Sequence, residues 1–337
     1  MLFYWDSATF ESHYNCSQRS YEEWEKEANP NVPLGLFYIV LSVTFQILYV
    51  PSIMTLGSKA FIKQSAYKIM FVLGIVDFTV LCFLGCLDGY LTIIGSIHCL
   101  NPRLTYISGI ISSALWVASC PITSLLAFSR AIDLLNSKLY RMLFHGNKTW
   151  YWMLIPLLYT LYFTLFTNPV LFSSKIYAQA NNPYVAIKGV WTNWSYVNTF
   201  LMINDVGIGL FLGIIYIICS YIIYRKFKKS SSKTVFTNAQ ASLIYQTSII
   251  TVAALITSLL FVYFNLFDAS VIASIVGEVF WIVHHGAAAP AYLFLNKTLR
   301  KHILAHYVPN RFQKAIVSST VVGTIQIKVK QRAVIIR

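Results

Sequence analysis

Long apolar stretches alternate with short basic segments along the chain, and this pattern predicts seven membrane-spanning helices. One long uncharged run covers residues 104–129 and leads directly into Arg130 and Asp133. Continued as an α-helix over 26 residues, this run would be about 39 Å long, which exceeds the ~30 Å hydrocarbon core of a bilayer. The predicted spans are residues 34–56, 67–95, 104–135, 150–171, 199–224, 240–264 and 269–295.

The third span is expected to be the central helix of the bundle. Its polar interior positions carry small or hydroxyl-bearing side chains, which let neighbouring helices approach closely and suit protein contacts better than lipid contacts. These positions are Ser112, Ser113, Ser119, Thr123 and Ser124.

The composition supports an all-α membrane protein with a single bundle domain. Of the 337 residues, 57% are hydrophobic and 11% are charged, whereas about a quarter of residues are charged in a soluble domain. The sequence shows no internal repeat and no linker. It therefore predicts an outer segment at 1–33, a seven-helix domain at 34–308, and a disordered cytoplasmic tail at 309–337. A short amphipathic helix is expected on the inner membrane face after the seventh span.

Basic residues are distributed very unevenly between the two predicted faces of the membrane. The net charge is +14, and 21 of the 26 Lys and Arg residues lie beside the inner ends of the spans if the N-terminus is outside. Cytoplasmic segments of membrane proteins carry such an excess, which predicts an N-out, C-in orientation. Anionic lipids of the inner leaflet account for the positive charge, so the sequence does not call for nucleic acid as a partner.

Two polar residues are expected to meet in the bundle core. Asp77 follows Lys68 by nine residues, which places its carboxylate about 14 Å into the membrane. Such a charge needs a partner or a water-filled cavity. Counting back from Lys297 places His285 at a similar depth, about 18 Å from the same face, so we predict an Asp77–His285 pair. A carboxylate held by hydroxyl groups, or a histidine bonded to a backbone carbonyl, is the alternative that the sequence leaves open.

The cysteines predict one disulfide. Only Cys16 and Cys99 fall in predicted outer segments, and the second outer loop, 172–198, contains no cysteine. Disulfides form on the oxidising side of the membrane, so a Cys16–Cys99 bridge is expected to tie the N-terminal segment to the start of the third span. Two free thiols are the alternative.

Four Asn-x-Ser/Thr sequences test the same topology. Asn15 and Asn193 lie in predicted outer segments and are the expected glycosylation sites, since only outer residues meet the glycosylation machinery. Asn147 and Asn296 lie in predicted inner segments and should stay unmodified.

Several short motifs, taken in their order and spacing, are similar to those of the nematode serpentine receptor class T chemoreceptor family. The resemblance covers residues 14–305 and implies a seven-helix G-protein-coupled receptor. The family further implies a small-molecule ligand, a heterotrimeric G protein, the plasma membrane of sensory cells, and no cofactor. The matching motifs are YNC (14–16), SAYKIMFVLGIVD (65–77), HCLNP (98–102), SRAIDLL (129–135), FHGNKTW (144–150) and NKTLR (296–300).

The resemblance also places candidate switch residues. Arg130, at the inner end of the third span, is expected to reach the G protein, with Asp77, His285 and Pro290 as further switch candidates. An arginine that only reaches lipid phosphate is the alternative. Ser129 stands where rhodopsin-like receptors carry an acidic residue beside the arginine. A locking ion pair between these two neighbouring residues is therefore not expected.

A ligand pocket is expected among the outer halves of the third, fifth, sixth and seventh spans. Polar side chains within aromatic walls are typical of small-molecule sites, and an unpaired membrane carboxylate is costly enough to suggest a function. The candidates are Tyr106, Ser113, Asp205, Tyr263 and Glu278.

Other functions fit the sequence less well. A transporter or channel is the main alternative, although transporters tend to show repeated halves and paired broken helices, which this sequence lacks. The seventh span has no lysine for a retinal Schiff base, which disfavours a light receptor. His284 and His285 diverge by about 100° on a helix, a poor geometry for a shared metal, and no metal-hydrolase or nucleotide-binding motif indicates an enzyme.

Overall fold

The computed structural model describes residues 10–11, 13–190, 196–229, 238–266 and 270–307. Within this part of the chain, seven helices are long and apolar enough to cross a membrane, as predicted. The spanning elements are α3 (Val32–Leu56), α4 (Ser65–Leu81) with α5 (Asp88–Ile94), α6 (Pro102–Leu135), α8 (Lys148–Phe166), α9 (Thr199–Lys229), α10 (Asn238–Leu266), and α11 (Val271–Gly286) with α12 (Ala288–Leu295).

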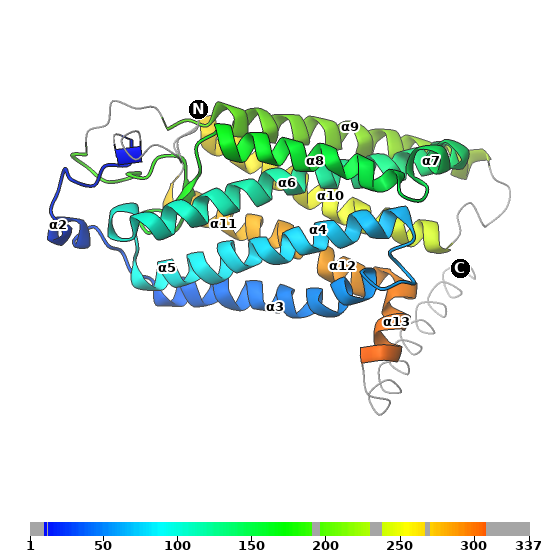
Figure 1. The fold of residues 1–337 in the computed structure, drawn as a ribbon, viewed down its shortest axis with the longest axis horizontal. Coiled ribbons are helices and arrows are strands. Elements are labelled where there is room, and N and C mark those ends of the chain that lie inside the picture. The colour runs from blue at the N-terminus through cyan, green and yellow to red at the C-terminus, as the bar shows by residue number, and fades with distance from the viewer. Residues whose placement is uncertain (1–9, 12, 191–195, 230–237, 267–269, 308–337) are drawn as a thin grey trace, which may run out of the picture.

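The helices run roughly parallel to one another, and shorter elements gather at the two ends of the bundle (Figure 1). At one end lie α2 (Tyr21–Glu25), a 3₁₀ turn (His98–Leu100) and the strands β1 (Leu171–Ser173) and β2 (Ala178–Ala180). We call this the disulfide end. At the other lie α7 (Ser137–Phe144) and α13 (Lys297–Tyr307), beside Arg130 and other basic residues. We call this the basic end.

Helix α6 is the central helix, as its small polar residues predicted. In its most apolar stretch 67% of residues are buried, against 17–50% in the other six spans. It contacts α4, α8, α9 and α10. By contrast, large apolar side chains of α8 and α9 are exposed, including Leu158 at 65% and Ile217 at 68%, and such a surface suits contact with lipid.

Three spans differ from the prediction in their continuity. The fourth was expected to reach residue 171 but ends at Phe166, because Pro169 disfavours a helical residue before it and Thr167 is already extended. In the second span a π-helical segment, Cys82–Leu87, separates α4 from α5. The seventh span is interrupted at Ala287, three residues before Pro290, whose missing N–H cannot bond the preceding turn.

The predicted amphipathic helix is α13, which leaves the bundle at a steep angle (Figure 1). The Asn296 side chain caps it by accepting a hydrogen bond from the Leu299 backbone N–H at 3.0 Å. Leu299 and Ile303, one turn apart, are buried against the bundle. The predicted tail, 309–337, lies outside the described residues.

A second hydrophobic cluster, separate from that of the bundle, forms at the disulfide end. The predicted Cys16–Cys99 disulfide is confirmed and joins the N-terminal segment to the 3₁₀ turn before α6. Trp24 donates its indole N–H to the Cys16 carbonyl at 2.8 Å. The aromatic members of the cluster are Tyr14, Trp24, Tyr106, Tyr184 and Tyr196.

Polar contacts tie the N-terminal segment to the β1–β2 hairpin. Glu27 forms ion pairs with Lys175 at 2.6 Å and with Arg19 at 2.9 Å. Hydrogen bonds from Lys175 and then from Arg19 lower the pKa of the Glu27 carboxyl. In the 3₁₀ turn at the same end, burial lowers the pKa of His98 to about 4, so this imidazole is neutral at physiological pH.

The hairpin lies close against α6 because of a glycine. A Cβ atom on Gly109 would lie 1.9 Å from the Val170 carbonyl oxygen, which no larger residue allows. Antiparallel pairing then places Phe172 opposite Gln179. The hairpin thereby reaches over the bundle from the disulfide end, and its second strand contacts α11.

Candidate functional site

A cavity of about 240 Å³ opens beneath the hairpin, among α6, α9, α10 and α11. This is the position at which the sequence predicted a ligand pocket. Its polar lining residues are Gln179, Asn181, Asp205, Ser274 and Glu278, and its aromatic lining residues are Trp116, Phe261, Phe264 and Trp281.

Asp205 connects α9 to the central helix from the wall of this cavity. Its Oδ1 accepts hydrogen bonds from the Trp116 indole N–H at 2.9 Å and from the Asn204 amide at 3.2 Å. Asn204 in turn accepts a hydrogen bond from the Tyr159 hydroxyl on α8 at 3.0 Å. Helices α6 and α9 therefore meet at the carboxylate, and α8 joins them through Asn204. Asp205 is 1% exposed.

Glu278 is the second carboxylate of the cavity wall and belongs to a cluster that the hairpin completes. It accepts a hydrogen bond from the backbone of Gln179. The Gln179 side chain donates to Asp88 at 2.6 Å and to Ser112 at 3.1 Å. Gln179 of β2 therefore bridges the second, third and seventh spans.

Three aromatic rings that contact one another form part of the wall. Trp116 packs edge-on against Trp281 with ring centroids 5.9 Å apart, and Phe261 lies 5.0 Å from Trp281 and 6.0 Å from Trp116. The three rings come from α6, α10 and α11. A ligand that moves any one of them would therefore shift the packing of all three helices.

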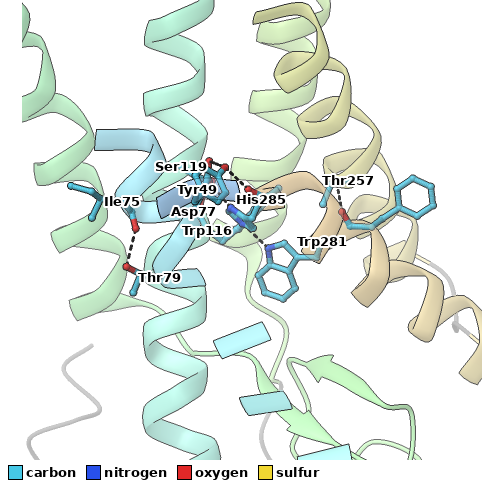
Figure 2. A network of polar contacts seen from close by, with 10 residues as sticks. Tyr49, Ile75, Asp77, Thr79, Trp116, Ser119, Thr257, Trp281 and His285 are labelled. Carbon is cyan, nitrogen blue, oxygen red and sulfur yellow. Dashed lines mark hydrogen bonds and ion pairs between the residues drawn. The ribbon is translucent and has the colours of Figure 1, made fainter. Parts of the chain in front are cut away.

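One of these rings connects the cavity to the core of the bundle. The Trp281 indole N–H donates to His285 Nε2 at 3.2 Å, and His285 Nδ1 lies 2.8 Å from Asp77 Oδ1. Figure 2 shows the Trp281 ring directed towards His285, which contacts Asp77 and Tyr49. The structure thus brings together the two residues that the sequence suggested as partners.

The hydrogen bonds determine the tautomer of His285. Because an indole N–H can only donate, Nε2 accepts, and the imidazole proton sits on Nδ1 and points to Asp77. The second oxygen of Asp77 lies 3.0 Å from the Tyr49 hydroxyl, which is also 2.6 Å from the His285 carbonyl. Tyr49 therefore joins α3 to both partners, although its single proton serves one acceptor at a time.

At the basic end, Arg130 is buried and held by neighbours on α6 and α7. It donates to the Tyr140 hydroxyl at 2.9 Å, stacks over the Tyr140 ring, and lies 3.7 Å from Asp133. Because residue 129 is a serine, Arg130 cannot form an ion pair with the residue before it. It instead contacts Asp133 and Tyr140, three and ten residues further along the chain.

The other predicted site residues lie apart from the cavity. Tyr106 packs in the aromatic cluster of the disulfide end, and Ser113 accepts a hydrogen bond from the Val170 backbone at 3.2 Å. Tyr263 is 48% exposed on the outer side of α10 and does not line the cavity. The structure therefore places only Asp205 and Glu278 of the five ligand candidates in the cavity wall.

The glycosylation candidates can be placed only in part. Asn15 is half-buried next to the disulfide, and its side chain accepts a hydrogen bond from the Ser17 backbone at 2.7 Å. Asn193 lies outside the described residues. Pro290 lies in the first turn of α12, just after the interruption of the seventh span.

Sequence reasoning missed several residues of the site. Asp88 lies within an apolar run, and the cost of a membrane carboxylate could have revealed it. Gln179 gave no such signal, because an amide in a polar loop is ordinary. Trp116 and Trp281 are aromatic residues in apolar helices, and nothing in their neighbourhood along the chain shows that they meet.

The comparisons with known proteins agree with this architecture. The model of the family described as "Serpentine type 7TM GPCR chemoreceptor Srt" matches residues 1–316. The chain is also similar to serpentine receptor class T-55 of Caenorhabditis elegans, with 24% identity over 295 residues, which cover 87% of this chain and 80% of that relative. With its seven spans, this multi-pass membrane protein belongs to the serpentine class T family of seven-transmembrane chemoreceptors of the G-protein-coupled type.

Proposed function

We propose that the protein binds a small molecule in the cavity beneath the hairpin and activates a heterotrimeric G protein at the basic end. The observation that carries this proposal is Trp281, which both lines the cavity and donates a hydrogen bond to the buried His285–Asp77 pair. A ligand that displaces this ring changes a polar contact in the bundle core, and differential contact with two states is what a switch requires.

The basic end offers a site that a G protein could stabilise. Arg130 borders a small cavity of about 30 Å³ between α6, α9 and α10. Its contacts with Tyr140 and Asp133 are local, so a separation of α10 from α6 would enlarge this cavity without breaking them. A permanently charged side chain there can contact an incoming protein.

The orientation belongs to the same proposal, with the disulfide end outside the plasma membrane of a sensory cell. Disulfides form on the oxidising side, and in the described residues the basic end carries the larger share of Lys and Arg. A chemical signal from outside would then enter at the hairpin. The alternative, a transporter or channel, has no comparable observation in its favour.

We expect glycosylation to report this orientation. Asn15 should carry a glycan, because it would lie outside, whereas Asn147, at the start of α8, should carry none. Glycosidase treatment of the expressed protein should therefore cause a mass shift that Asn15→Gln reduces. A shift that disappears in Asn147→Gln would reverse the proposed orientation.

We expect Arg130→Ala to reach the cell surface and to lose signalling. Cells expressing the receptor would be exposed to a panel of volatile and soluble compounds with a calcium or cAMP readout. Any compound that activates the unmodified receptor should give no response in the variant. Arg141→Ala is the matched control, since Arg141 is exposed on α7 at the same end and its loss removes the same charge.

Two outcomes of that experiment would contradict the proposal. Full signalling by Arg130→Ala would exclude the arginine from the switch. A ligand-dependent ionic current in the purified, reconstituted protein without any G protein would favour the channel alternative.

A further inference from the structure

The polar cluster beside the cavity contains hydrogen-bond acceptors that the protein leaves without donors. Within the described residues, Glu278 Oε1, Asp88 Oδ1 and Gln179 Oε1 are buried and have no hydrogen-bond partner. Glu278 is only 2% exposed, yet it lines the cavity. Buried polar atoms are nearly always paired, so three unpaired oxygens in one cluster indicate a missing donor.

All three unpaired atoms are oxygens, which restricts what could satisfy them. The Gln179 amide nitrogen donates to Asp88 and Ser112, and the amide oxygen, which can only accept, is left without a donor. Asp205 adds a further acceptor, because both of its donors, Trp116 and Asn204, reach the same oxygen, Oδ1. The missing group must therefore donate several hydrogen bonds and need not accept any.

The charge of the cavity points in the same direction. Two carboxylates line it, and no Lys, Arg or His is among the described residues that line it. A buried carboxylate is costly unless it is paired with a cation or neutralised by a proton. A cationic ligand would supply both the charge and the donors, whereas an anionic ligand would meet two like charges.

The rest of the wall suits a ligand with an apolar part. The rings of Trp116, Phe261 and Trp281 contact one another, and aromatic faces attract cations as well as apolar groups. The volume of about 240 Å³ is below the range of roughly 300–1,000 Å³ that is usual for drug-sized ligands. The occupant must therefore be small.

From these observations we propose that the cavity binds a small primary amine, with Glu278 as its counter-ion and the aromatic rings around its apolar part. An ammonium group carries three N–H donors and no acceptor, which suits the acceptors of Glu278, Gln179 and Asp205 that line the cavity, whereas Asp88 is not among the lining residues. The inference rests on the proposed function in taking this cavity as the ligand site. It adds the chemical class of the ligand.

Binding can be measured without any G protein. The probes are butylamine, cyclohexylamine and phenethylamine, each with its alcohol, its N-trimethylated form and a carboxylate of similar size. Thermal unfolding of the purified full-length receptor in nanodiscs would be followed against probe concentration. We expect at least one primary amine to raise the unfolding temperature, and we expect the matched alcohol, trimethylammonium and carboxylate probes to bind at least tenfold more weakly.

Variants locate the effect at the cavity. Glu278→Gln should weaken amine binding about 10- to 100-fold, because a hydrogen bond to a charged group is lost. Glu22→Gln is the matched control, since Glu22 is exposed on α2 at the same end and its loss removes the same charge. Glu278→Asp keeps the charge and should retain part of the affinity. This second variant allows the test to be made even if Glu278→Gln folds poorly.

The outcomes separate this inference from the proposed function. If no amine stabilises the receptor, or if Glu278→Gln binds amines as well as the unmodified protein does, the amine assignment is wrong. Arg130-dependent signalling to a compound of another class would in that case leave the proposed function standing. If amines bind as expected but Arg130→Ala signals fully, the ligand class stands and the proposed switch fails.

Discussion

Replacing Asp77 by alanine should destabilise the bundle by roughly 3–5 kcal/mol, the range measured when one partner of a buried pair is removed. The change leaves the His285 Nδ1–H without its acceptor at 2.8 Å and removes one of the two acceptors near the Tyr49 hydroxyl. Thermal unfolding in nanodiscs would measure the loss. Thr79→Ala is a control on the same helix, because the Thr79 hydroxyl bonds to the Ile75 carbonyl one turn away (Figure 2).

A double-mutant cycle tests whether Asp77 and His285 act as partners. If they do, the variant carrying both Asp77→Ala and His285→Ala should be destabilised by clearly less than the sum of the single changes, with a coupling of about 0.5–3 kcal/mol. Additive losses in stability and in signalling would show that the contact seen in the structure carries no energy of its own.

Asp77→Asn distinguishes a structural carboxyl group from a switching one. The asparagine oxygen can accept from His285, and its amide can donate to the Tyr49 oxygen while the Tyr49 proton serves the His285 carbonyl. Most of the stability should therefore be retained. Loss of signalling in this stable variant would assign the carboxylate itself to the switch, whereas normal signalling would limit Asp77 to holding the bundle together.

The spans could be predicted because the bilayer imposes their length and polarity. Residues 104–135 are apolar over more than the membrane thickness, and α6 is indeed the most buried span. The π-helical interruption of the second span depends on a tertiary contact instead. At the π-helical segment, a Cβ atom on Gly85 would lie 1.5 Å from the Ser42 hydroxyl. The π-helical segment and α3 pack very closely there. The local sequence of either segment does not show that the other lies beside it.

In the candidate site, too, some residues could be identified from the local sequence, and others are brought together only by the fold. Asp205 and Glu278 could be identified from the sequence because a carboxylate in an apolar helix is costly wherever it points. Tyr263 could not be placed, because α10 is apolar on all sides and its sequence does not show which face is buried. Gln179 meets Asp88 across 91 residues, and only the folded hairpin brings the two together.

The N-terminal segment should depend on the Cys16–Cys99 disulfide. The bridge joins residues 83 positions apart, and a closed loop of that size removes much conformational entropy from the unfolded chain. Removal of such a bond typically costs about 2–5 kcal/mol. The aromatic cluster and the Trp24–Cys16 hydrogen bond remain, so we expect a loosened disulfide end and lower surface expression, while the bundle itself still forms.

Serine substitutions at the two positions should behave alike. Cys16→Ser and Cys99→Ser should each lower surface expression, and the double variant should be no worse than either, because the first substitution already removes the bond. Cys86→Ser is the control, since Cys86 is a free, half-buried thiol near the end of the second span. Labelling of both thiols in unreduced cell-surface protein would contradict the bridge.

Because Cys99 precedes α6 by only a few residues, the disulfide couples the N-terminal segment to the helix that carries both Trp116 and Arg130. Its loss should therefore weaken ligand responses more than its effect on expression alone would explain.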